Sequence, residues 1–213
     1  AECAPRHSAG PLAAKGVYHL PVLSAVGCER LVRELANFRA SGLERARPNS
    51  MNENGVLLGE LGFGARLLDP LLATYVQPLA GALFAECGGA TLDHHRSFTV
   101  EYEAGGEESL AYHFDDSEVT LNVCLSGDSE YEGGELLFGA DKSEGDAAHE
   151  RRWPLRHKQG WGVLHRGSHN HEAAPVTGGV RTNLIMWLRS SAVRQHHCPM
   201  CGRGATECGL VKT

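Results

Sequence analysis

The sequence predicts a mainly β fold of the sandwich or barrel type, braced by helices near its N-terminal end. Two observations indicate this fold. From Leu92 onward, short runs of β-prone residues alternate with Gly-rich breaks, which is typical of strands joined by turns. Before Leu92, two longer stretches carry apolar residues at helical spacing. With 213 residues, 42% of them hydrophobic, the chain is long enough to bury one sizeable core.

Both N-terminal stretches are expected to form helices. The first, SAVGCERLVRELANFRAS, begins with Ser24 as a candidate N-cap. Its expected apolar face comprises Val26, Leu31, Leu35 and Phe38. The second, LLDPLLATYVQPLAGALFAEC, has Pro70 near its start and Pro78 where a kink is expected. The segment between them, RPNSMNENGVLLGELGFG, is rich in Asn and Gly and is expected to be a loop.

The second half supplies the strands. They are expected at SFTVEY, EVTLNVCL, GELLFGA, RRWPLR, GWGVLH, EAAPVT and RTNLIMWLR. No internal repeat or low-complexity linker interrupts the chain, so we expect a single domain over residues 1–213. It would comprise a helical part at about 20–90, a β core at about 91–190 and a Cys- and His-containing tail at 191–213, with the helices on the outer face of one sheet.

Composition excludes several classes of protein. The net charge of −6 provides no basic surface for nucleic acid, and no apolar run reaches the roughly 20 residues that span a bilayer. The chain begins at Ala1 without Met and without an apolar signal core, so we expect a processed or trimmed product. Seven scattered cysteines, an odd number, do not fit a secreted disulfide framework and favour reduced thiols.

Ligand-type residues cluster around the expected strands. In HFD, His113 and Asp115 are two residues apart, so on a strand both would point to the same face. Two histidines and one carboxylate form the facial triad of non-haem Fe(II) oxygenases, which leaves positions on the metal open. The later segment LHRGSHNHEAAPVTGGVR offers the third ligand from among His165, His169 and His171. It also offers Arg181, past the expected turn TGG, as a clamp for a carboxylate.

With these pieces in order, the sequence resembles the Fe(II) and 2-oxoglutarate-dependent dioxygenases, in the branch of the prolyl and procollagen-lysyl hydroxylases. The resemblance covers roughly Phe98 to Arg189 and includes, after Tyr102 and HFD, the segments TLNVCL, YEGGELLF, GWGVLHRG and HEAAPVTGGVR. It implies a double-stranded β-helix, the jelly-roll of two facing sheets, with Asp115 near a strand end and His171 on a facing strand.

The resemblance also implies roles for single residues. By position, His113, Asp115 and His171 match the iron ligands, because His171 alone stands ten residues before Arg181. Arg181 matches the residue that pairs with the distal carboxylate of 2-oxoglutarate, and Tyr102 and Asn122 match inward positions near that cosubstrate. The implied reaction consumes 2-oxoglutarate and dioxygen, with ascorbate as a candidate reductant, and yields succinate, CO2 and a hydroxylated lysyl or prolyl side chain of a protein.

The tail RQHHCPMCGRGATEC lies outside this pattern. Cys198 and Cys201 form a CxxC pair, and Cys208 follows closely, so zinc, a redox or disulfide pair, and free thiols are all open.

His165 is a candidate neighbour of the metal ligands, and Asp116 is expected in a solvated turn. The three tryptophans are expected in the core, and the loop from Pro48 to Gly62 either contacts substrate or is plain surface.

Two other functions stay open at this point. A small-molecule hydroxylase with the same core would differ only in its substrate. A catalytically silent jelly-roll that binds another protein would turn over no 2-oxoglutarate. The intact set of ligands and Arg181 favours an enzyme. The compartment is undecided, because reduced thiols favour the cytosol or nucleus, whereas a collagen-type substrate would require the secretory pathway.

Overall fold

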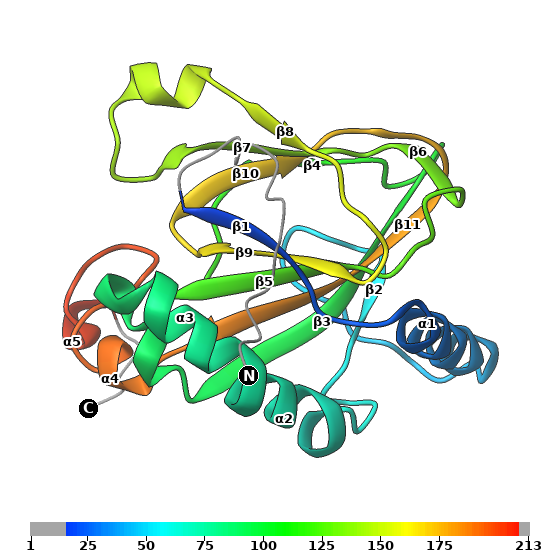
Figure 1. Ribbon diagram of the computed structural model, residues 1–213, viewed down its shortest axis with the longest axis horizontal. Coiled ribbons are helices and arrows are strands. Elements are labelled where there is room, and N and C mark those ends of the chain that lie inside the picture. The colour runs from blue at the N-terminus through cyan, green and yellow to red at the C-terminus, as the bar shows by residue number, and fades with distance from the viewer. Residues whose placement is uncertain (1–15, 209–213) are drawn as a thin grey trace, which may run out of the picture.

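The computed structural model of the chain describes residues 16–208 and contains two antiparallel sheets, with helices packed on the larger one (Figure 1). The predicted mainly β, jelly-roll architecture with N-terminal helices is therefore confirmed. The expectations about the chain start and Cys3 fall in residues 1–15, outside the described part. No helix among the described residues has the length and apolar character needed to cross a membrane.

The larger sheet has the strand order β1-β9-β5-β11-β3-β2, and β6 also pairs with β11. Its strands are β1 (Val17–Pro21), β2 (Gly55–Leu57), β3 (His94–Glu103), β5 (Val119–Cys124), β6 (Tyr131–Gly133), β9 (Trp161–Arg166) and β11 (Val176–Arg189). The smaller sheet has the order β4-β10-β7-β8. Its strands are β4 (Leu110–His113), β7 (Leu136–Asp141), β8 (Trp153–Leu155) and β10 (His169–Ala173).

The alternation of side chains along the strands divides the core into two clusters. On β11, Leu184, Met186 and Leu188 face the helices, whereas Ile185 and its neighbours in alternate positions face the other sheet. The inner cluster joins Phe98 and Val100 of β3 to Leu136 and Phe138 of β7. Polar residues on this inner face therefore lie between two apolar layers, which is where the candidate site is found.

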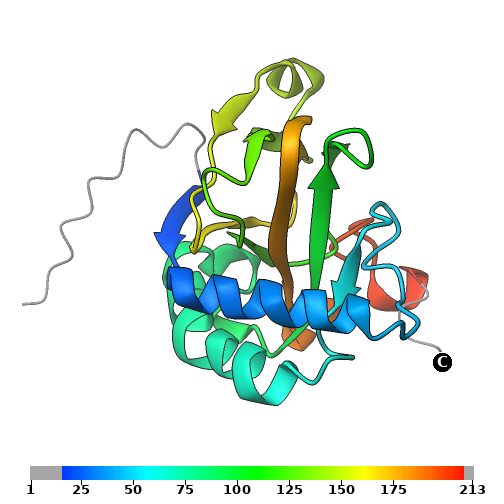
Figure 2. The same ribbon diagram turned by 90° about the vertical axis from the view of Figure 1, so that its right-hand side faces the viewer.

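Helix α1 (Ala25–Ala40) begins as expected, because the Ser24 side chain accepts a hydrogen bond from the backbone N–H of Gly27 at 3.1 Å. Leu31 and Leu35 are buried against the sheet, and α1 runs across the direction of β11 (Figure 2). Val26 was expected on the same face but is 55% exposed, and Cys28 is buried instead.

The second expected helix is a succession of turns of different width. Widened π-helical turns at Gly64–Leu68 and Leu72–Val76 precede α2 (Asp69–Leu71) and α3 (Gln77–Leu83), each of which has a proline in its first turn. Pro70 and Pro78 donate no N–H and crowd the carbonyl four residues earlier, and a wider turn relieves both conflicts. Two proline-linked irregularities thus replace the single kink expected at Pro78.

Several strands depart from the expectation. β1 lies in a segment for which no element was expected, and β2 lies in the expected loop. Each pairs with a strand distant in the sequence, β1 with β9 and β2 with β3. The expected turn TGG lies inside β11, where Gly179 has a φ of 71° and the pairing with β6 shifts register. The tail adds two short helices, α4 (Ser191–Arg194) and α5 (Ala205–Cys208).

Candidate metal centre

Three metal-ligand side chains meet between the two sheets. His113 closes β4, Asp115 follows two residues later, and His171 on β10 is paired directly with His113 in the antiparallel ladder. One ligand atom from each residue lies within 4.8 Å of the other two. His113 Nε2 is 3.6 Å from Asp115 Oδ1, and His171 Nε2 is 3.8 Å from Asp115 Oδ2. The structure thus brings together the three residues that the sequence pattern selected.

Their positions on the strands agree only in part with the expectation. β4 ends at His113, so Asp115 lies near a strand end as the resemblance implied, but in the loop that follows and not on the strand with His113. His171 belongs to the neighbouring strand of the same sheet, not to a facing strand. The pairing of β4 with β10 therefore sets the two imidazoles side by side, and the turn after β4 brings the carboxylate to them.

Both imidazoles are oriented by backbone carbonyls. His113 Nδ1 lies 2.7 Å from the carbonyl oxygen of Ala111, and His171 Nδ1 lies 3.0 Å from that of His169. Because a carbonyl only accepts, each Nδ1 carries a proton, and the Nε2 atoms are the ones that face Asp115. Burial, partly opposed by the charge of Asp115, lowers the pKa of His171 to about 4, so its imidazole is neutral at neutral pH.

Asp115 is buried and is fixed by its surroundings. Its backbone N–H donates to the carbonyl of Gly167 at 2.8 Å, and Oδ2 accepts from the Thr120 hydroxyl at 2.6 Å. His165 Nε2 lies 4.0 Å from Oδ2 and has no hydrogen-bond partner, while its Nδ1 faces the carbonyl of Arg166 at 2.8 Å. His165 is therefore a neighbour of the carboxylate, as the sequence suggested, and not a member of the ligand trio.

The trio opens into a cavity of about 290 Å³ between the sheets. One wall is apolar and includes Phe98, Ile185 and Trp187. Another contains Arg181, which projects from β11 on the inner face of the larger sheet. The volume is near the lower end for small-molecule sites, and a mostly apolar lining with a few polar groups is typical of such sites.

Arg181 is a buried cation without a carboxylate partner. Its side chain is 0% exposed, and its guanidinium donates through Nη1 to the carbonyl of Gly134 and lies 4.9 Å from the ring of Tyr102. Its Nε has no hydrogen-bond partner, and no carboxylate of residues 16–208 lies within ion-pair distance. Burial lowers the pKa of Arg181. A cation held in this way is suited to receive an anion in the cavity.

The two residues expected near the cosubstrate also line the cavity. Tyr102 is buried on β3, and its hydroxyl accepts from the Asn52 side chain at 3.3 Å. Burial raises the pKa of Tyr102 to about 12, so the phenol stays protonated. Asn122 on β5 accepts from the side-chain amide of Asn183 at 2.6 Å, and the same amide donates to His157 Nδ1 at 3.1 Å.

The sequence reading missed three polar residues on this inner face. Thr120 holds Asp115, and Asn183 and His157 extend the network from Asn122. Two of them could have been predicted from strand spacing. Thr120 is two residues from Asn122 on β5, and Asn183 is two residues from Arg181 on β11, so each pair points to the same face of the sheet. His157 comes from the loop before β9, where no strand period applies.

Other residues singled out in the sequence have structural partners. His169 Nε2 faces the carbonyl of Gly139 at 2.8 Å, away from the ligand trio. Asp116 is not merely a solvated turn, since it pairs with Arg189 at 2.6 Å and with Arg194 at 2.9 Å. Trp187 lines the cavity and packs edge-on against Phe98.

Part of the loop expected between the two helical stretches borders the cavity. Asn49, Met51 and Asn52 all line it. Glu107 organises this segment, because its carboxylate accepts from the Asn52 side chain at 2.8 Å and from the backbone N–H of Asn54 at 2.9 Å. Met200 of the tail lines the same cavity. Segments from the two ends of the described chain thus meet at one site.

Comparison with known proteins gives consistent results. A family model described as an OGFOD2-like domain matches residues 6–89. The chain is 45% identical over 199 residues to 2-oxoglutarate and iron-dependent oxygenase domain-containing protein 2 of Xenopus tropicalis, a match covering 93% of this chain and 55% of that protein. The chain spans about half the length of this relative and of its human counterpart.

Two further matches widen the comparison. Human multifunctional procollagen lysine hydroxylase and glycosyltransferase LH3 is 31% identical over 190 residues, covering 81% of this chain and 23% of that protein. The crystal structure of a Pseudomonas putida prolyl-4-hydroxylase covers 84% of this chain and 95% of its own, with a TM-score of 0.57 at 21% identity, and shares the fold. The relatives by sequence and the neighbours by fold agree with the resemblance stated above. This chain belongs to the 2-oxoglutarate and iron-dependent oxygenase family, and it shares its fold with a prolyl-4-hydroxylase.

Proposed function

We propose that this chain binds Fe(II) through His113, Asp115 and His171, binds 2-oxoglutarate with the help of Arg181, and hydroxylates a C–H bond on a lysyl or prolyl side chain of a protein. The observation that carries the proposal is that the ligand trio and the unpaired Arg181 line one cavity. The reaction class follows from these groups, and the choice of substrate rests on the named relatives.

The donor set fits a divalent iron. Two imidazoles place their Nε2 atoms near a carboxylate, and all three residues are held in place by hydrogen bonds that use neither Nε2 nor Oδ1. Three protein ligands of this type leave coordination positions open. Bound together, Fe(II), 2-oxoglutarate and dioxygen supply the oxidation, in which one oxygen atom enters the substrate C–H bond and the other enters succinate, with release of CO2.

The surroundings of Arg181 fit the distal carboxylate of 2-oxoglutarate. A buried guanidinium with an unpartnered Nε is costly alone and is stabilised by a carboxylate, which matches its planar donors. Tyr102 and Asn122 flank the same space with a protonated hydroxyl and an amide. These residues bind and orient the cosubstrate, while the apolar wall at Phe98, Ile185 and Trp187 excludes water.

Two observations support a protein substrate. LH3 and the P. putida enzyme are named as lysine and prolyl hydroxylases, respectively. In this chain, the loop residues Asn49 and Met51 and the tail residue Met200 border the cavity, and both methionines are about two-fifths exposed. Adaptable, partly exposed side chains of this kind suit a peptide that lies across the opening and inserts one residue.

The first test is release of succinate from 2-oxoglutarate by the purified chain with Fe(II), and with ascorbate to keep the iron reduced. We expect turnover by the wild type and none by His171→Ala. The control is His94→Ala, since His94 is exposed on β3 and its imidazole is hydrogen-bonded to Asp93, away from the ligand trio. Equal succinate from wild type and His171→Ala would contradict the assigned ligand.

The second test identifies the substrate. Peptides and cell proteins are incubated with the enzyme, and mass spectrometry locates residues that gain one oxygen atom in the wild-type reaction but not with Asp115→Ala. Hydroxylated lysyl or prolyl residues would support the proposal. Oxygen incorporated only into small molecules would assign the same chemistry to a small-molecule hydroxylase instead.

A further inference from the structure

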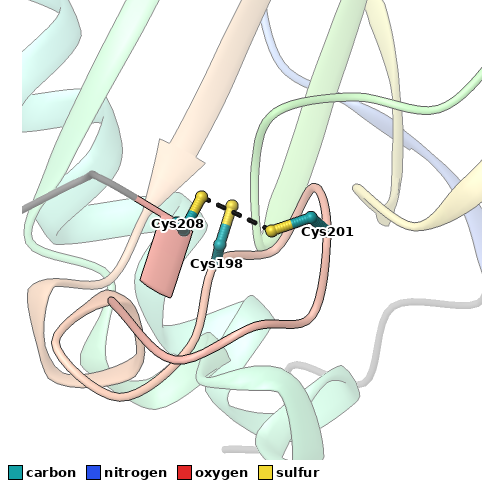
Figure 3. A group of neighbouring side chains, drawn as sticks. All are labelled: Cys198, Cys201 and Cys208. Atoms are coloured by element: carbon teal, nitrogen blue, oxygen red, sulfur yellow. Dashed lines mark hydrogen bonds between the residues drawn. The ribbon is translucent and has the colours of Figure 1, made fainter. Parts of the chain in front are cut away.

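The tail after β11 gathers three cysteines at one point. Cys198 is buried, Cys201 is exposed, and Cys208 at the end of α5 is half-buried. Figure 3 shows their three sulfur atoms pointing toward one another from different parts of the tail. All three sulfurs lie within 4.8 Å of one another, and the sulfurs of Cys201 and Cys208 are 3.4 Å apart. This cluster takes no part in the site described above.

The backbone around Cys198 forms a compact turn. Its N–H donates to the carbonyl of Arg203, its carbonyl accepts from Gly202, each at 2.8 Å, and Gly202 has a φ of 71°. The turn therefore fixes the position of Cys198 relative to Cys201 in the CxxC segment.

The spacing of the sulfurs matches a tetrahedral metal site. Zinc binds thiolates at about 2.3 Å, which places pairs of sulfur ligands roughly 3.8 Å apart. The observed cluster brackets this value, with the closest pair at 3.4 Å and all three pairs within 4.8 Å. A disulfide would use two of the sulfurs and would leave the convergence of the third unexplained. Thiolate ligands in tetrahedral geometry select zinc over harder divalent cations.

We propose that Cys198, Cys201 and Cys208 bind a structural Zn²⁺ as three thiolates. In residues 16–208, no imidazole or carboxylate shares the 4.8 Å spacing with all three sulfurs, so His196 and His197 stay outside the group. A fourth ligand from outside this group would complete the tetrahedron. Binding releases the thiol protons and closes the tail into a knuckle, defined here as residues 198–208.

The knuckle contacts the oxygenase site. The Lys142 ammonium donates to the carbonyls of Pro199 and Met200, which lie between Cys198 and Cys201, and it is 4.6 Å from the centre of the Phe114 ring. Phe114 stands between His113 and Asp115 in the chain. Met200 itself lines the cavity. Bound zinc would thus hold Met200 in place at the edge of the cavity. The proposed zinc site itself does not require the chain to be an active oxygenase.

The test measures metal in a chain that lacks the oxygenase site. His171→Ala removes one ligand of the trio, so any zinc retained there comes from the tail. We expect about one zinc per His171→Ala chain by elemental analysis. We also expect a thiolate-to-metal charge-transfer band when Co²⁺ replaces the zinc. Adding Cys198→Ser, Cys201→Ser or Cys208→Ser should abolish both signals.

The matched control is Cys87→Ser in the same background, because Cys87 is a half-buried thiol outside the cluster and its carbonyl contacts suit a hydroxyl. Retention of zinc by the control and its loss from the three tail variants would establish the site. Absence of zinc from His171→Ala with no Co²⁺ charge-transfer band would overturn the proposal. A Cys201–Cys208 disulfide, found by mass spectrometry of chains isolated without reductant, would also overturn it.

Discussion

Arg181 shows how a single residue can leave a site incomplete. A full positive charge is buried on β11, and its polar contacts within residues 16–208 are the carbonyl of Gly134 and the face of Tyr102. Removing a charge from water is expensive unless a counter-charge and hydrogen bonds replace the lost hydration. The structure supplies only part of this compensation. The cosubstrate carboxylate would supply the rest.

We expect Arg181→Ala to weaken 2-oxoglutarate binding by at least about 2 kcal/mol, or roughly 30-fold, because it removes one partner of a buried charge pair. Titration of succinate release against 2-oxoglutarate checks the shift. The 2-oxoglutarate affinity of Arg181→Lys should lie between those of the wild type and Arg181→Ala. Lysine keeps the positive charge but lacks the planar set of donors that fits a carboxylate. The control is Arg33→Ala on the exposed face of α1. An unchanged 2-oxoglutarate requirement in Arg181→Ala would refute the assigned role.

Thr120 orients a proposed ligand without binding the metal. Its hydroxyl donates to Asp115 Oδ2 at 2.6 Å, so the almost isosteric Thr120→Val removes this bond and little volume. We expect metal affinity to fall by about 10-fold, as is usual for groups that orient ligands. Co²⁺ or Mn²⁺ titration measures it. Thr99→Val is the matched control, because Thr99 is equally buried but its hydroxyl accepts from Val56. The same loss in both variants would indicate a general effect of packing.

At this scale, spacing along the chain predicted the residues that short local patterns carry. His113 and Asp115 are two residues apart, which marked them directly, whereas the resemblance selected His171 from three histidines through its separation of ten residues from Arg181. Thr120, His157 and Asn183 were missed, because their partners lie on other strands or in loops. Cross-strand contacts depend on register, which a single sequence leaves open.

Among the elements, the turn between β9 and β10 packs closely against the segment that carries Asp115. Gly167 donates to the carbonyl of Glu118 at 3.0 Å and accepts from the N–H of Asp115 at 2.8 Å. A Cβ at Gly167 would lie 1.9 Å from the carbonyl oxygen of Ser117. Two stretches of backbone therefore approach too closely for any side chain between them.

We expect Gly167→Ala to cost about 1–3 kcal/mol of the free energy of unfolding, the usual range for overpacking, and also to weaken metal binding as the segment shifts. Urea unfolding and Co²⁺ titration measure the two effects. Gly178→Ala on β11 is the control, because the nearest atom to its Cβ would be a carboxylate oxygen at 3.5 Å, an ordinary contact. An unchanged free energy of unfolding in Gly167→Ala would contradict the prediction, because it would show that the backbone of the turn can shift to accept a Cβ at little cost.

The elements also show where propensity was a poor guide. β1 and β2 are short and lack strong alternation, and they become strands only through their pairing with β9 and β3. Val26 matched the helical period of α1 but lies near the helix start, where it faces solvent. The cap at Ser24 was predictable, since it needs only a local hydroxyl and a free backbone N–H.

For the whole molecule, the interior contains several neutral histidines. Burial lowers the pKa of His157 and His165 well below the usual value and that of His171 to about 4. The unfolded chain protonates these groups near pH 6.5, before the folded chain does. Their contribution to stability is therefore complete above pH 6.5 and is lost as the pH falls toward 4.

We expect the free energy of unfolding of the metal-free chain to fall by a few kcal/mol between pH 7 and pH 4.5, on the order of the linkage of two or three such groups. Urea unfolding at a series of pH values measures the slope. His157→Asn should reduce that slope, because it removes one buried group outside the ligand trio. An equal slope in wild type and His157→Asn would show that this histidine makes no contribution.

The mainly β architecture could be predicted from the short β-prone runs and Gly-rich turns that begin near Leu92. Both reflect local backbone preferences, which a single sequence contains. Strand order was not predictable, because β5, β9 and β11 become neighbours only through the fold. The knuckle was visible only as a CxxC pattern with several interpretations. The convergence of its third sulfur depends on α5, which the pattern did not predict.

The pairing of β1 with β9 has a consequence for how the chain is made. β1 lies at the edge of the larger sheet and finds its ladder partner in residues 161–166. During synthesis, β1 therefore stays without this partner until residues 161–166 have been made. His113 on β4 likewise meets the other proposed histidine ligand, His171, only after β10 has been made. Folding therefore depends on late, long-range closures, which are slow, and the proposed metal site forms only after β10 has joined β4.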